Sequence, residues 1–69
     1  MSKDTFKRHR LDDNQEWAVK VVRSNAEDLD RVFDEWIADS RERSIAKTKL
    51  EEAVMWANKA IAIHGVNDG

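Results

Sequence analysis

Apolar residues recur every three or four positions through the first half of the chain, with polar residues between them. The stripe is formed by Ala18, Val22, Ala26, Leu29, Phe33 and Trp36, with Val19 and Ile37 at one edge. This spacing places side chains on one face of an α-helix. Residues 19–22 are locally β-prone, but they lie inside about six turns of helical periodicity. We therefore expect a helix, and Asp12 and Asp13 are both suitable N-cap residues.

A second helical segment begins near the tetrapeptide DSRE, residues 39–42. Asp39 is suited to cap the first amides while Glu42 reaches back, which is the arrangement of a capping box, and Ser40 is the alternative cap. The segment continues to about His64, and Gly65 is expected to end it in the αL conformation.

A short link between two long amphipathic helices favours an antiparallel arrangement. The chain has no proline, and its only glycines are Gly65 and Gly69. The sequence thus predicts an all-α fold in which residues 12–64 form a two-helix antiparallel hairpin. Residues 1–11 are expected to form an irregular arm and residues 65–69 a frayed tail.

The second helix has apolar residues on more than one face. Leu50, Val54, Ala57 and Ile61 form one row, Trp56 and Ile63 lie about a third of a turn away, and Met55 lies opposite. One partner helix covers the narrower stripe of the first helix but not all of this surface, so we expect self-association. The expected interface comprises Leu50, Val54, Met55, Trp56, Asn58 and Ile61. Periodicity alone leaves open a four-helix bundle or a ring-like or cage-like assembly.

Composition strengthens the expectation of a homo-oligomer. A chain of 69 residues is one small domain and buries only ~60% of the surface that its unfolded form exposes. It has no cysteine, and its two histidines, His9 and His64, are far apart, so disulfides and a metal site are not expected to stabilise it. A net charge of −2 does not suggest a partner such as polymeric nucleic acid. Without an apolar run of ~18 residues or a secretory signal, the chain is expected to be cytoplasmic and not membrane-bound.

The sequence SRERSIAKTKLEEAVMWANKAIA, residues 40–62, resembles the helical hairpin domain of bacteriophage anti-CBASS sponges, which sequester cyclic oligonucleotide signals. A related hairpin occurs in Thoeris anti-defence sponges, which capture cyclic ADP-ribose isomers. The resemblance implies a short helix packed on a longer, kinked one in a compact hexamer. It also implies binding of cyclic dinucleotides such as cyclic GMP-AMP between protomers, without cleavage, in the cytoplasm of an infected bacterium. Some relatives hold cyclic trinucleotides at separate sites.

The resemblance also assigns ligand-binding positions in the arm and first helix. Phe6 and His9 have the family's F-x-x-H spacing. Between them, Arg8 replaces a tyrosine that stacks on a base, and arginine can stack and contact phosphate. Arg23 corresponds to a lysine that contacts phosphate, with Lys20 as the alternative if the register differs.

The second type of site is expected to be weakened. Asn25 corresponds to a threonine associated with trinucleotide binding, and His64 lies near the position of an arginine that serves the same site. A neutral histidine holds phosphate less firmly than arginine. Trp56 and Asn58 belong to the best-matched stretch, but a core or interface role for Trp56 and an inter-helix hydrogen bond for Asn58 are the favoured interpretations.

No catalytic constellation is recognised. Glu51 and Glu52 are adjacent on a helix, so their side chains diverge by ~100° and do not converge on one substrate atom. No nucleophile with a base, phosphate-binding glycine loop or metal cluster is present, and no cofactor or enzyme activity is expected. Three hypotheses follow: a sponge for cyclic dinucleotides, a sponge for cyclic ADP-ribose isomers, and a purely structural or protein-binding helical oligomer.

Overall fold

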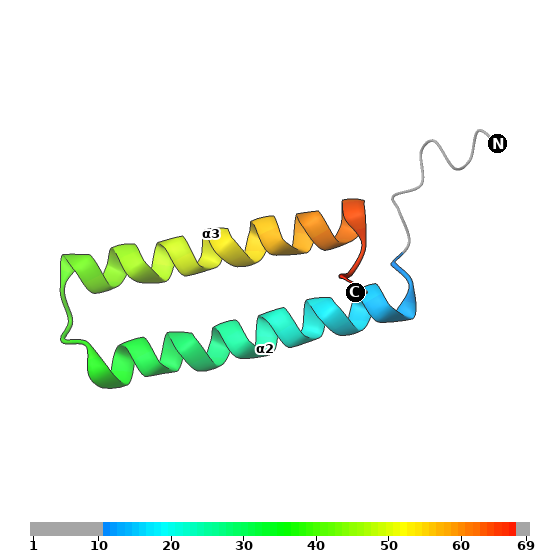
Figure 1. Cartoon of the computed structure of the whole chain (residues 1–69). Helices are drawn as coiled ribbons and strands as arrows, with labels where there is room; N and C mark the ends of the chain where they lie inside the picture. The colour runs from blue at the N-terminus through cyan, green and yellow to red at the C-terminus, as the bar shows by residue number, and fades with distance from the viewer. Residues whose placement is uncertain (1–10, 68–69) are drawn as a thin grey trace.

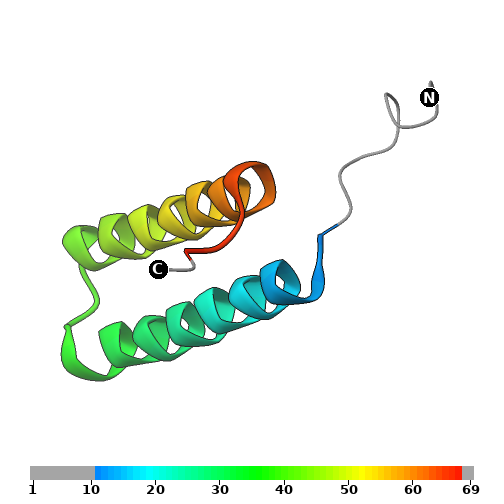
Figure 2. The ribbon, with the colours of Figure 1, turned by 45° about the vertical axis from the view of Figure 1, so that its right-hand side comes forward.

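The computed structural model describes residues 11–67 as two α-helices, α2 (Asp13–Trp36) and α3 (Arg41–His64). They lie side by side and antiparallel, joined by the short link at residues 37–40 (Figures 1 and 2). The predicted all-α hairpin is confirmed. Each helix has 24 residues, so the two described helices are equal in length and do not form the short-and-long pair that the resemblance implies. The capping signals delimit two segments of equal length, about 36 Å each.

The helix starts follow from side-chain capping. Asp12 accepts a hydrogen bond from the amide of Gln15 at 2.7 Å, and the Gln15 side chain accepts one from the amide of Asp12 at 2.8 Å. In α3, Ser40 accepts from the amide of Arg43 at 3.1 Å. The cap is therefore Ser40 and not Asp39. The predicted reciprocal contact from Glu42 is wrong, because the third helical position after Ser40 is Arg43.

Gly65 ends α3, as predicted, and its amide donates to the carbonyl of Ile61 at 2.9 Å. Its φ of 84° is positive, but its ψ of −169° lies outside the αL region that we expected. This combination is essentially restricted to glycine. Gly65 and Val66 are half-buried, so these two residues lie against the hairpin instead of fraying.

The seam between the helices contains most of the predicted stripe. Its half-buried apolar residues are Ala18, Val19, Val22, Ala26 and Phe33 on α2, and Leu50, Val54, Ala57 and Ile61 on α3. Trp36, the last residue of α2, is 80% exposed and does not belong to the seam. Leu29 is 42% exposed at the seam's edge.

Polar contacts join the helices at both ends of the seam. Near the link, Lys47 Nζ lies 2.7 Å from Asp34 and 3.6 Å from Asp30. Arg43 lies 3.2 Å from Asp39 and donates to the carbonyl of Ile37 at 3.0 Å. We call the five charged residues, Asp30, Asp34, Asp39, Arg43 and Lys47, the polar latch. At the other end, Gln15 Nε2 donates to the carbonyl of Ile61 at 2.8 Å.

Apolar surface remains uncovered on both helices. No residue between 11 and 67 is fully buried. Large exposed apolar side chains include Trp17, Val21, Val32 and Trp36 on α2, and Met55, Trp56 and Ile63 on α3. One partner helix therefore leaves apolar surface of the first helix exposed as well, because valines and tryptophans also occur outside its inward stripe.

Candidate ligand-binding site

The seam is bordered by a shallow groove on each flank, and the two grooves differ in chemistry. Arg23, Glu27, Asp30 and Glu51 surround the first, which we call the charged groove. The second, the apolar groove, is lined by residues that include Val21, Asn25, Leu29, Ala53 and Ala57. Both share a floor of Ala26, Leu50 and Val54. The charged groove has a volume of about 450 Å³, which is within the range of small-molecule sites.

Two predicted cations lie on the flank of the charged groove. Arg23 lines it directly, and Lys20 is one helical turn earlier on the same side of α2. Neither has an ion pair with any residue of the described part of the chain, whereas Arg43 and Lys47 do. The guanidinium and the ammonium are thus available to an external anion.

Asn25 lies on the other flank. Two residues along a helix correspond to a rotation of ~200°, so Asn25 lines the apolar groove while Arg23 lines the charged one. Its side-chain amide donates to the carbonyl of Val21 at 2.9 Å. The structure therefore does not bring Asn25 and Arg23 together.

The remaining predicted ligand positions belong to the open end of the hairpin or lie outside the described residues. His64 is exposed at the end of α3, and the Gln15–Ile61 hydrogen bond joins this end to the start of α2. Phe6, Arg8 and His9 fall in residues 1–10, which the structure does not describe.

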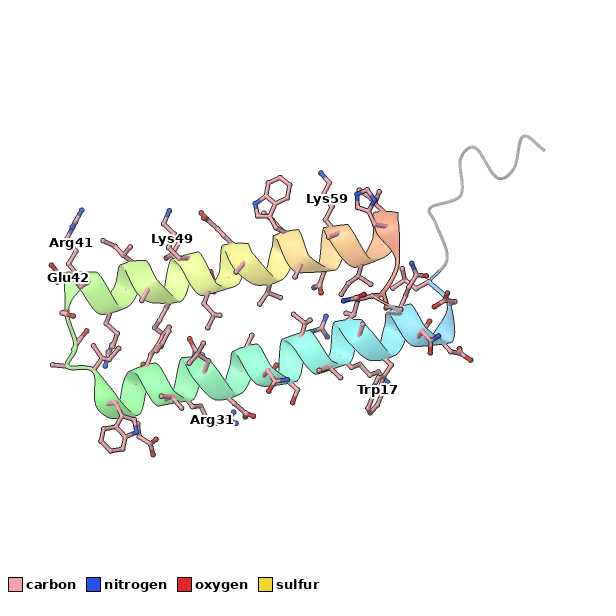
Figure 3. The ribbon with its side chains drawn as sticks, in the orientation of Figure 1. Trp17, Arg31, Arg41, Glu42, Lys49 and Lys59 are labelled. Atoms are coloured by element: carbon pink, nitrogen blue, oxygen red, sulfur yellow. The ribbon has the colours of Figure 1, made fainter. Side chains whose placement is uncertain are left out.

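The predicted interface residues separate into two groups. Leu50, Val54 and Ile61 are half-buried in the seam of one hairpin, whereas Met55 and Trp56 are 55% and 59% exposed. Lys59 Nζ lies 5.1 Å from the centre of the Trp56 ring, and Figure 3 shows Lys59 pointing away from α2. The outer side of α3 is thus partly aromatic and uncovered.

Asn58 differs from its predicted role. Its Oδ1 is shielded from solvent but accepts no hydrogen bond from residues 11–67. The expected inter-helix hydrogen bond to this oxygen is therefore not formed within one hairpin.

Sequence reasoning missed several residues of the site. The sequence pattern gives no site signal for Glu27 and Asp30 and presents Glu51 only as half of a candidate acid/base pair, although all three border the charged groove. Their positions become apparent only when the two helices are aligned. In the described segment, no group of three or more His, Asp or Glu side chains is arranged to hold a metal ion. Neither α2 nor α3 is apolar enough over its length to span a membrane.

The structure defines a class of protein: a small antiparallel helical hairpin with two distinct grooves beside its seam and unpaired cations on one flank. Comparison with protein families matches residues 2–62 to the Acb2/Tad1 hairpin domain. The chain belongs to this family, which confirms the resemblance to anti-CBASS and Thoeris anti-defence sponges for cyclic nucleotide signals. No individual curated protein and no solved structure matched the chain.

Proposed function

We propose that this protein is a non-enzymatic sponge that binds cyclic dinucleotide second messengers, such as cyclic GMP-AMP, and so blocks bacterial CBASS anti-phage signalling. The observation that carries the proposal is Arg23, a cation on the charged groove that has no ion pair among residues 11–67. The resemblance aligns it with a lysine that contacts ligand phosphate. Binding without cleavage lowers the free messenger concentration by mass action. Such a protein needs many tight sites but no catalytic group.

Electrostatics indicate that a complete site uses more than one hairpin. The charged groove is bordered by Arg23 and Arg31, but also by Glu27, Asp30 and Glu51, and Arg31 already pairs with Asp28. Two phosphates require more positive charge than this groove offers. We propose that a second copy of the chain, or the basic residues 7–10, supplies it in a compact hexamer with sites between protomers.

A sponge for cyclic ADP-ribose isomers is the second candidate. The family includes both kinds of sponge by its description, and Arg8 stands where the dinucleotide-binding relatives have a stacking tyrosine. An arginine can contact phosphate and stack on a base, so it suits either ligand. The two functions differ only in the signal that is captured.

The test is calorimetric titration of the purified protein with cyclic GMP-AMP, followed by chromatography to look for cleavage products. We expect binding and no product. Arg23→Ala should weaken binding by about tenfold to a hundredfold, because a charge-assisted hydrogen bond contributes about 1.5–3 kcal/mol. Arg41→Ala is the matched control, since Arg41 points away from α2 at the far end of α3 (Figure 3) and should leave affinity unchanged.

Other outcomes select among the hypotheses. Binding of cyclic ADP-ribose isomers without binding of cyclic dinucleotides would favour the second candidate. Binding of neither class, with the assembly intact by light scattering, would favour a purely structural or protein-binding oligomer. Appearance of a linear nucleotide product would show that the protein is not a simple sponge.

A further inference from the structure

The charged groove contains carboxylates that phosphate binding does not explain. Asp30 lies 3.6 Å from Lys47 and is already paired. Glu27 on α2 and Glu51 on α3 have no ion pair with residues 11–67, and they border the groove from its two helices. Unpaired carboxylates beside Arg23 lower the affinity for any anion. Their presence is understandable if the ligand also has hydrogen-bond donors that require an acceptor.

Guanine is the nucleobase that satisfies such a carboxylate best. An ionised carboxylate only accepts hydrogen bonds, and its two oxygens can accept a parallel pair. The Watson–Crick edge of guanine has two adjacent donors, N1–H and the N2 amino group. Adenine has its N6 amino group next to the acceptor N1, whose lone pair repels a carboxylate. The pyrimidine bases likewise lack two adjacent donors on this edge.

The groove also provides a surface for a flat base and a separate position for phosphate. Ala26, Leu50 and Val54 form its apolar floor between Glu27 and Glu51. Arg23 lies one turn before Glu27 on α2, about 6 Å along the helix axis. Phosphate and base of one ligand can therefore contact different residues of the same groove.

We propose that Glu27 and Glu51 bind the Watson–Crick edge of guanine, so that the charged groove selects guanine-containing cyclic dinucleotides. This inference rests on the proposed function and specifies its ligand. Selectivity arises in two ways: the carboxylates accept two hydrogen bonds from guanine, and they disfavour ligands that have no such donors.

The test compares cyclic di-GMP with cyclic di-AMP, which have the same charge and backbone and differ only in their bases. We expect the wild-type protein to bind cyclic di-GMP at least about tenfold more tightly. Glu27→Gln and Glu51→Gln should each reduce this ratio by about tenfold, mainly by weakening cyclic di-GMP binding. Binding of cyclic di-AMP should stay the same or become tighter, because a negative charge is removed.

Glu52→Gln is the matched control. Glu52 follows Glu51 directly, lies 3.7 Å from Lys49 and does not border the charged groove, so its substitution should leave the ratio unchanged. Circular dichroism and light scattering would establish that all three variants keep the wild-type fold and assembly. A wild-type ratio near one, or a ratio insensitive to both groove substitutions, overturns guanine selection while the sponge function stands. Failure of the wild-type protein to bind cyclic di-GMP, cyclic di-AMP and cyclic GMP-AMP overturns the dinucleotide function itself.

Discussion

Gln15 joins the two helices through a single side chain. Its Oε1 accepts from the amide of Asp12 in the capping box, and its Nε2 donates to the carbonyl of Ile61 at the end of α3. Sequence reasoning found the cap at Asp12 but not the second contact, because Ile61 is 46 residues away.

We expect Gln15→Ala to reduce the free energy of unfolding by about 1–2 kcal/mol, because both a capping interaction and a hydrogen bond are lost. Urea unfolding followed by circular dichroism at fixed protein concentration measures this change. Gln15→Glu separates the two effects, since glutamate retains the acceptor for Asp12 but cannot donate to Ile61. It should therefore lose less stability than the alanine variant. Equal stability of the alanine variant and wild type would contradict the role assigned to Gln15.

The candidate site was only partly predictable at the scale of single residues. Arg23 was found because the family resemblance points to one position. Glu27 and Glu51 were not assigned to a site, because their relation to Arg23 depends on how α2 and α3 are aligned. Asn58 was expected to make an inter-helix hydrogen bond, and its shielded Oδ1 has no such bond within residues 11–67. The local sequence pattern indicates which residues can bind a ligand or form a hydrogen bond. Which residues they contact depends on how α2 and α3 are aligned.

The helices as elements were well predicted because their boundaries depend on local chemistry. Asp12, Ser40 and Gly65 act through contacts within one turn of the chain, so their signals are readable in sequence. The exposure of Trp36 was not predicted. Periodicity assigns a residue to one face of its helix but does not show how much of that face the partner helix covers. The boundaries of the helices could therefore be predicted from the sequence, but the packing of one helix on the other could be predicted only in part.

The polar latch makes hairpin stability depend on pH. The hydrogen bond from Lys47 holds the pKa of Asp34 below its usual value of 3.8. The same bond raises the pKa of Lys47 above 10.5. The stabilisation due to Asp34 is thus complete above pH 3.8 and is lost as pH falls through the lowered pKa. The stabilisation due to Lys47 is complete below pH 10.5 and is lost as pH rises through the raised pKa.

We expect the thermal unfolding midpoint to decrease as pH is lowered below about 4, with part of the decrease caused by protonation of Asp34. Lys47→Met should lower the midpoint at neutral pH and make the acid-induced decrease smaller, because the partner of Asp34 is absent. Lys49→Met is the control, since Lys49 pairs within residues 11–67 only with Glu52 on its own helix. An identical pH profile for the wild type and Lys47→Met would rule out the latch as the source of this dependence.

A single hairpin does not form a buried core from residues 11–67. No described residue is buried, and Trp17, Trp36 and Trp56 are 67%, 80% and 59% exposed. Domains of this size have a small stability margin even when compact. The exposed apolar surface supports self-association. The number of copies could not be predicted from sequence, because periodicity indicates which faces are apolar but not the angles at which copies meet.

Light scattering should give a mass of about six times 8.0 kDa for the assembled protein. Dilution to the point of dissociation should shift tryptophan emission to longer wavelength, because the three indole rings become solvated, and should reduce helical content at the same time. The chain has no tyrosine, so tryptophan dominates the signal. A mass of 8.0 kDa with full helical content would contradict obligate assembly.

The antiparallel arrangement of the helices determines where a label can be attached if this protein is used as a biosensor. Leu11 and Asn67 lie at the same end of the hairpin, opposite the link (Figure 1). A label attached at Leu11 or at Asn67 would therefore lie at this end of the hairpin. Asp39 is at the other end with an 89% exposed side chain, and the chain has no native thiol. Asp39→Cys would give a unique attachment point for a fluorophore or a solid support, remote from Lys20 and His64.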